Sequence, residues 1–228
     1  MKRYLFALLI PLPVLSQEVG FPPEHSPYRD LEYRQELTGF AGWFAASKDP
    51  AGVAPQAGPM VGLRYELRIA GPAQLVARFA NVFSERTIID PAEPAATRVV
   101  GTESWPLVLG DVGISVNLTG QKSIRGFVPV VSTGLGVVSD TKGGSTDVGG
   151  YRFGTAFAFN FGGGVRWVPG GRFQLRADLQ DYMYNIRYPI QYYGDIAGNN
   201  AVLPNTQSRT LWKHNAAMTL GGSYLFFR

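Results

Sequence analysis

The sequence predicts an all-β fold, an eight-stranded antiparallel up-and-down transmembrane β-barrel with a polar, side-chain-filled interior. Three observations support this prediction. Apolar and polar residues alternate with a period of two in run after run, as they do in strands with one apolar face. Short turns alternate with long loops, which is typical of barrels that cross an outer membrane. After the leader, no window of about eighteen apolar residues remains to form a membrane-spanning helix.

The composition fits many strands joined by tight turns. The chain has 228 residues, 28 of them glycine, with 45% hydrophobic, 13% aromatic and only 17% charged residues. The absence of cysteine excludes a disulfide framework, a cysteine nucleophile and a thiolate metal site. Without Lys2 and Arg3 the net charge falls from +4 to +2, with 19 basic against 17 acidic residues. The basic residues form no run, so no nucleic-acid partner is expected.

The first sixteen residues have the features of a secretory signal peptide. Lys2 and Arg3 precede an apolar run over 4–15, which Pro11 and Pro13 interrupt. We expect residues 1–16 to be removed by cleavage after Ser16, and the mature protein to be exported.

Residues 17–35 form a proline-rich segment ahead of the barrel, on the periplasmic side. Two interpretations remain open for this segment. It is a tether lying under the barrel, which is favoured, or a plug or partner-binding arm. The barrel itself is expected over 36–228.

The first three strands are expected at 36–47, 60–70 and 73–84. The second shows the alternation most clearly, because Arg64, Glu66 and Arg68 share one face of the run LRYELRI, 63–69, and apolar residues share the other. The short turn AGPA, 70–73, joins it to the third strand.

The fourth and fifth strands are expected at 104–119 and 126–140, with a short turn over 120–125 between them. Val112, Ile114 and Val116 share a face in the fourth. Pro129 would remove a ladder hydrogen bond from the fifth strand, so it is expected near a rim or a bulge.

The last three strands are expected at 151–168, 172–186 and 211–227. In the sixth, Phe157, Phe159 and Phe161 lie on one face. The short turn VPGG, 168–171, joins it to the seventh strand. Four long loops should lie at the opposite end from the short turns, near 48–59, 85–103, 141–150 and 187–210.

We expect the apolar face to meet lipid and the charged face to line the lumen. An arginine facing lipid near mid-membrane costs about 2–4 kcal/mol, and an eight-stranded barrel leaves an interior that side chains just fill. Unpaired charges there would be costly, so the inward charges should pair with one another. The predicted lumen polar network comprises Arg64, Glu66, Arg68, Arg78, Asp111, Arg166, Arg176 and Asp178.

Aromatic residues near strand ends predict girdles at the two membrane interfaces. The expected girdle residues are Trp43, Trp105, Trp167, Trp212, Tyr224 and Phe226.

The final strand resembles that of outer-membrane barrel proteins, because Met218, Leu220, Tyr224 and Phe226 alternate toward an aromatic finish. The chain departs from that pattern by ending in Phe227-Arg228. Over 36–228 it is most similar to small eight-stranded barrels of the OmpA/OmpX-like and OmpW-like kind. The resemblance implies a cell outer membrane location. With an even number of strands, both termini are expected on the short-turn side, which is the periplasm. The resemblance also implies contact with outer-membrane lipid and lipopolysaccharide, and recognition by the barrel-insertion machinery.

Three functions remain open. A non-enzymatic barrel that is structural or binds through its surface loops is favoured; the loop over 187–210 offers aromatic side chains for a surface or hydrophobic ligand. A narrow porin-like or OmpW-like channel for small hydrophobic compounds is the alternative. A lipid-modifying enzyme would need His214 with a serine and a carboxylate, of which Ser139, Ser145, Ser208 and Asp195 lie on the same side. No cofactor is expected, and a calcium site in the loop over 140–147 is disfavoured.

Overall fold

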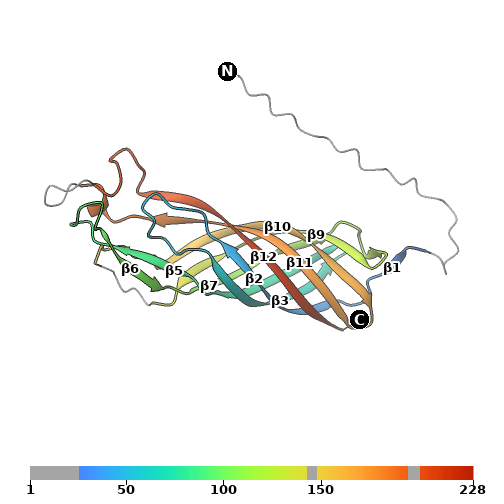
Figure 1. Ribbon diagram of the computed structural model, residues 1–228. Helices are drawn as coiled ribbons and strands as arrows, with labels where there is room; N and C mark the ends of the chain where they lie inside the picture. Colours follow the sequence, from blue (N-terminus) through green and yellow to red (C-terminus); the bar gives the residue numbers. More distant parts are fainter. Residues whose placement is uncertain (1–25, 143–147, 195–200, 228) are drawn as a thin grey trace, which may run out of the picture.

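The computed structural model describes residues 26–142, 148–194 and 201–227. Eight antiparallel strands form a closed barrel, because β12 pairs with β2 and β7 pairs with β9 (Figure 1). The fold class predicted from the sequence is therefore confirmed. The barrel strands are β2 (Gln35–Ala45), β3 (Gly58–Ala70), β4 (Ala73–Val82), β7 (Leu107–Asn117), β9 (Phe127–Asp140), β10 (Thr155–Gly170), β11 (Phe173–Arg187) and β12 (Thr210–Phe226).

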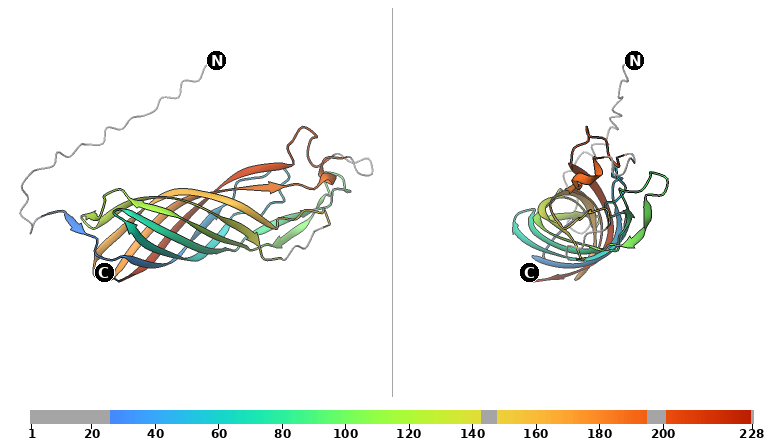
Figure 2. Two further views of the ribbon diagram at one scale, coloured as in Figure 1. Left: turned by 180° about the vertical axis from the view of Figure 1, so that it is seen from behind. Right: turned by 90° about the vertical axis from the view of Figure 1, so that its left-hand side faces the viewer.

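Each predicted strand is present, with ends that differ by a few residues. Tight turns join β3 to β4 and β10 to β11, where Gly71 and Gly171 have φ of 50° and 72°. Such positive φ values suit glycine in short hairpins. The long loops lie together at the other end. We call the two ends of the barrel the turn end and the loop end (Figure 2).

Following the strand register once round the barrel shows how far the strands are staggered. Successive partners of Arg68, taken through β4, β7, β9, β10, β11, β12 and β2, lead back to Gly58 on the same strand, ten residues away. A stagger of this kind requires strands that are tilted to the barrel axis. The tilt is visible in both side views (Figures 1 and 2).

Four short strands lie outside the barrel, and the sequence pattern did not reveal them. β5 (Glu85–Ile89) and β6 (Val99–Ser104) form a separate hairpin within the loop between β4 and β7. β1 (Tyr28–Asp30) pairs with β8 (Lys122–Ile124), so the N-terminal segment is attached to the turn that joins β7 to β9. The 3-10 helix η2 (Ile190–Tyr192) lies in the last loop.

The outer wall is a continuous apolar surface. Leu63, Phe79 and Leu220 are 56%, 57% and 68% exposed, although their type is normally buried. The alternate residues of the same strands, such as Arg64 and Arg78, are buried in the lumen. A surface this apolar requires hydrocarbon rather than water around it. No described helix is long and apolar enough to cross a membrane.

The lumen is filled by two layers of different chemistry. The half near the turn end contains the buried charged side chains of the lumen and most of its buried amides, although Asn215 is buried toward the loop end. The half near the loop end is filled by apolar and aromatic residues that belong to one cluster with buried loop residues. The predicted polar interior is therefore present in one half of the barrel and is wrong for the other half. The reason is that the inward residues near the loop end, such as Phe44, Met60 and Leu109, are themselves apolar.

Candidate functional site

Four arginines and four carboxylates form an ion-pair network across the turn-end half of the lumen. Arg176 lies at its centre: its Nη1 is 2.8 Å from Glu66 Oε2 and its Nε is 2.6 Å from Asp178 Oδ2. Arg64 lies 2.5 Å from the other oxygen of Glu66 and 3.4 Å from Asp178. All four residues are at most 9% exposed. Buried charges persist only when they are paired and hydrogen-bonded in this way.

The network extends from the centre toward both ends of the barrel. Toward the turn end, Arg166 Nη2 lies 2.5 Å from Glu36, which also lies 3.5 Å from Arg176. Toward the loop end, Arg78 Nε donates to Asp111 at 2.8 Å, and the Tyr182 hydroxyl donates to the same carboxylate at 3.3 Å. We call these eight residues, Arg64, Arg78, Arg166, Arg176, Glu36, Glu66, Asp111 and Asp178, the lumen ion-pair network.

The observed network differs from the predicted lumen polar network at two residues, Glu36 and Arg68. Glu36 was missed, although it is the first residue of the strand expected over 36–47. Its alternation with the outward Leu37 was the available signal. Arg68 forms no ion pair with a described residue; it is half-buried at the turn end, where its Nη2 donates to the Leu31 carbonyl at 2.7 Å.

Above the network, apolar side chains close the lumen. Phe44 and Tyr182 pack with ring centroids 6.5 Å apart, and the residues around them are almost fully buried. A void of about 20 Å³ lies at the boundary between the two layers and is lined by residues of each. It has room for about one water molecule. We call this layer the apolar plug; it comprises Phe44, Met60, Ala80, Val82, Leu107, Leu109, Val138, Ala156, Ala158, Tyr182, Tyr184, Ile186 and Ala217.

The loops continue the plug into a packed layer, which we call the loop cap: Val53, Ile89, Trp105, Tyr151, Tyr188, Tyr192 and Leu203. Arg86 is fully buried and lies 4.5 Å above the Trp105 ring and 4.8 Å above the Tyr151 ring, within cation–π range. The Tyr188 hydroxyl donates to Asp49 at 2.8 Å. The described parts of the loops are therefore packed against one another.

The girdle prediction is wrong for Trp105. Trp105 comes directly after β6 and is 2% exposed, because it packs in the buried cluster of the loops. Its Nε1 donates to Asp140 at 3.2 Å. The structure places the other expected girdle residues on the outer wall. Trp43 and Trp212 lie toward the loop end, where Trp212 packs against Phe159. Trp167 lies at the turn end, as do Tyr224 and Phe226, which stack with centroids 6.3 Å apart.

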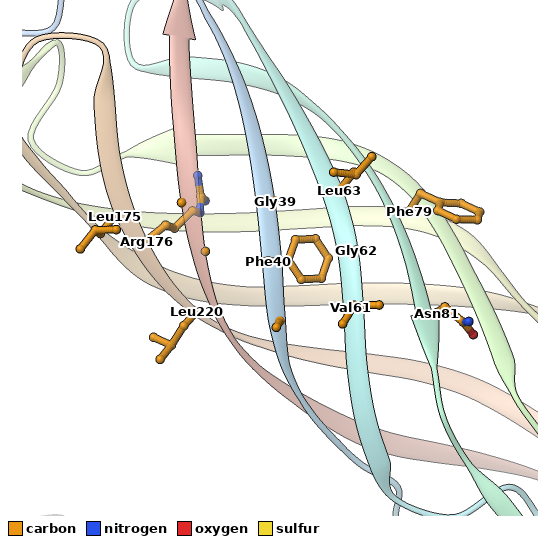
Figure 3. A pocket seen from close by; sticks show the side chains of 13 residues that line it. Gly39, Phe40, Val61, Gly62, Leu63, Phe79, Asn81, Leu175, Arg176 and Leu220 are labelled. Carbon is orange, nitrogen blue, oxygen red and sulfur yellow. The ribbon is translucent and has the colours of Figure 1, made fainter.

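An apolar groove of about 910 Å³ runs along the outer wall over β12, β2 and β3 (Figure 3). Leu175 and Leu220 lie on one side of it, and Leu63 and Phe79 lie on the other (Figure 3). Glycines between them, including Gly39, provide no side chains to fill the space. The groove faces the apolar surroundings of the barrel and is not a passage into the lumen, because the strand pairing beneath it is unbroken.

His214 points outward and pairs with Asp181, with Nδ1 2.6 Å from the carboxylate; the side chain of His214 is 65% exposed. Ser139 instead bonds Thr155, and Ser208 donates to the Thr210 carbonyl. Ser145 and Asp195 lie outside the described residues. No hydrogen bond joins His214 to a serine in the described chain, so the structure does not bring a Ser-His-acid arrangement together.

The described residues contain no group of three His, Asp or Glu side chains placed to hold a metal ion. In the loop over 140–147, Asp140 accepts from Trp105 and from the Gly154 amide, and Asp147 lies outside the described residues.

Closed topology, an apolar outer wall and a filled lumen define the class: the chain has the fold of small eight-stranded outer-membrane β-barrels. Neisserial surface protein A has a similar structure, with a TM-score of 0.50 and 13% identity over 84% of this chain and 97% of that chain. The outer membrane protein OprG from Pseudomonas aeruginosa has a TM-score of 0.52 and 9% identity over 86% of this chain and 98% of that chain. No family model and no curated protein sequence matches the chain.

Proposed function

We propose that the chain is a non-enzymatic outer-membrane barrel that presents a rigid binding surface on its loop cap and conducts no solute through its lumen. The observation that carries this proposal is the double filling of the barrel. A solute entering from the turn end meets the lumen ion-pair network, and one entering from the loop end meets the loop cap and the apolar plug.

The loop end offers apolar side chains that the loop cap does not use. Val99 and Val100 on β6 are 63% and 61% exposed, and Ile190 on η2 is 70% exposed. Apolar side chains displayed on a packed scaffold are suited to binding, because little entropy is lost when they are covered. In this proposal the loop end faces outward from the cell and both termini are periplasmic.

Labelling of single cysteines tests the orientation without background, since the chain has no cysteine of its own. Val100→Cys on the β5–β6 hairpin should react with a membrane-impermeant maleimide on intact cells. Lys122→Cys at the turn end is the matched control, and it should react only after the outer membrane is opened. The opposite labelling pattern would overturn the orientation.

Planar-bilayer recording tests the closed lumen. The purified barrel should show no steady conductance, and a heat-dependent shift in gel migration should verify that the protein in the assay is folded. Steady channels from folded protein would reject the proposal.

A narrow channel for small hydrophobic compounds is the second candidate, and the apolar plug is the observation that favours it. An apolar lining suits apolar solutes if the loop cap opens. Uptake of an apolar dye into vesicles containing the barrel, compared with empty vesicles, distinguishes this candidate from a sealed barrel.

A lipid-modifying enzyme resting on His214 is disfavoured, because the His214–Asp181 pair lacks a bonded serine within the described part of the chain. Unchanged membrane lipid A in cells carrying His214→Ala would eliminate this function.

A further inference from the structure

The β5–β6 hairpin lies at the loop end and forms a two-stranded sheet separate from the barrel (Figures 1 and 2). A two-stranded sheet has two outer edges. The edge formed by β5 is covered by the loop between β2 and β3, where the Gln56 amide donates to the Glu85 carbonyl at 2.8 Å. The Gln56 side chain also donates to the Thr87 hydroxyl at 3.1 Å. The edge formed by β6 is the opposite one.

The hydrogen-bond pattern of the hairpin identifies the groups of β6 that face its outer edge. In an antiparallel pair, opposed residues that exchange backbone hydrogen bonds alternate with opposed residues that do not. The Trp105 amide donates to the Ser84 carbonyl at 2.8 Å, so these two residues are of the first kind. Ser104 and Glu85, the next pair, are of the second kind, in agreement with the outward direction of the Glu85 carbonyl. Ser104 and Thr102 therefore direct their N–H and C=O groups away from β5.

These outward groups of β6 have no backbone partner within the residues that the structure describes. Beyond the pairing with β5, no residue of Val99–Ser104 takes part in a backbone hydrogen bond in that part of the chain. Every residue of β6 except Gly101 is exposed. The strand contains neither lysine nor proline, the residues that commonly protect an edge from pairing with another chain. The edge of β6 is therefore open to a further strand.

We propose that an extended segment of another polypeptide binds the loop end as a third strand, paired with the outer edge of β6. The inference rests on the proposed surface function and names the class of partner for it. An extended chain presents backbone donors and acceptors at the same repeat as the edge, which is how strand addition recognises a partner. A hydrocarbon chain has no such groups, so lipid does not fit this edge.

The side chains of β6 indicate what the added strand should carry. Thr102 and Ser104 share one face of the strand, and hydroxyl residues opposite them can form hydrogen bonds across the strands. Val99 and Val100 are 63% and 61% exposed, and they suit β-branched or aromatic residues. Glu103 is already paired with Lys142 at 2.8 Å. The partner segment should therefore be uncharged, with apolar residues at one end and threonine or serine at the other.

A labelled peptide with the sequence of residues 84–90 is the probe, because this segment already pairs with β6 within the chain. The control peptide is N-methylated at Thr87 and Ile88, which removes one N–H from each of its edges and keeps the side chains. Fluorescence anisotropy with the mature protein in nanodiscs measures both dissociation constants. The unmodified peptide should bind at least tenfold more tightly, as expected when two or more pairing hydrogen bonds are lost.

Thr102→Pro should weaken binding of the unmodified peptide by about tenfold or more, because proline removes the outward N–H and its ring occupies the edge. The bonds between β5 and β6 do not use that N–H, so the hairpin is retained. Thr102→Val is the matched control, because it keeps the N–H and suits a strand, and it should bind as the parent protein does. Heat-dependent gel migration and loops that resist limited proteolysis show that both variants are folded.

Equal binding of the two peptides, equal binding by the two variants, or no binding of the unmodified peptide would overturn the third strand. Labelling of Val100→Cys on intact cells separates this failure from failure of the proposed function. Cells that are labelled while no peptide binds retain the surface function and lose only the third strand. Cells that are not labelled lose the surface function on which the inference rests.

Discussion

Arg176 is the residue on which the lumen ion-pair network converges. It contacts Glu66, Asp178 and Glu36, and it is 3% exposed. Four arginines and four carboxylates balance one another in the described lumen, so the loss of one cation leaves a buried negative charge without compensation.

Arg176→Leu should therefore lower the free energy of unfolding by about 3–5 kcal/mol. Urea unfolding in lipid vesicles, followed by tryptophan fluorescence, measures the change. Arg172→Gln removes an exposed arginine from the adjacent turn and should leave the urea midpoint where it is. Equal midpoints for Arg176→Leu and the parent protein would show that water replaces the lost cation.

Glycines on the two faces of the wall should differ in their tolerance of a methyl group. A Cβ at Gly62 would lie 2.4 Å from the Phe40 ring and 2.4 Å from the Phe79 carbonyl oxygen, whereas a Cβ at Gly39 would meet nothing within 4 Å. Gly62→Ala should therefore destabilise the barrel by about 1–3 kcal/mol through overpacking. Gly39→Ala is the control, and it should be neutral or stabilising in the same urea assay.

For single residues, the sequence predicts which face of a strand a side chain occupies better than it predicts the ion-pair partner of that side chain. Alternation is local, so it identifies the shared face of Arg64 and Glu66. The contact of Arg176 with Glu66 depends on the stagger around the whole barrel, because these residues are 110 positions apart. Trp105 misled the prediction because its position near a strand end suits both a girdle and a folded loop.

Among the elements, the loop cap differs from a set of flexible loops because buried phenols and a buried guanidinium order it. Burial raises the pKa of the Tyr188 phenol, and the nearby Asp49 carboxylate raises it further. Burial likewise raises the pKa of Tyr151 and of Tyr192. A phenol whose pKa is raised in the folded state contributes stability below its unfolded pKa, and this contribution is lost as the pH rises.

The loop cap should therefore open above about pH 10, the ordinary pKa of tyrosine, while the barrel remains closed. Limited proteolysis across this pH range should show loop cleavage with the heat-dependent gel shift retained. Tyr188→Phe should make the loops cleavable at neutral pH, since the Asp49 carboxylate loses the phenol hydrogen bond and keeps only the longer ones from the Val53 and Ala54 amides. Tyr193→Phe, which removes an exposed hydroxyl bond to Ser208, is the control. Loops that stay resistant at high pH would contradict the role given to the phenols.

The barrel strands were predictable and the four short strands were not, for a physical reason. A barrel strand runs for ten or more residues with an apolar outward face, and its inward face is polar in the half near the turn end, so its alternation is strong there. β6 is exposed at nearly every position and β1 has three residues, so neither shows a face. β1 pairs with β8 in the turn between β7 and β9, and β6 pairs with β5 in the loop between β4 and β7. Both pairings therefore depend on how the barrel strands position these connections.

For the whole molecule, the barriers to conduction lie in series along one axis: the N-terminal segment at the turn end, the lumen ion-pair network, then the apolar plug with the loop cap. In a series arrangement, removing the outermost barrier leaves the others closed. The bonds of the N-terminal segment are with the rim, through β8, Gln121 and Phe227, rather than with the centre of the lumen. This arrangement favours a tether along the rim over a plug that fills a pore.

A variant lacking residues 26–33 should therefore insert, retain the heat-dependent gel shift and remain as silent as the parent protein in planar bilayers. A rise in conductance on deletion would show that the segment plugs an otherwise open barrel. That result would also require the lumen ion-pair network to rearrange, since its buried arginines and carboxylates fill the cross-section next to the deleted segment.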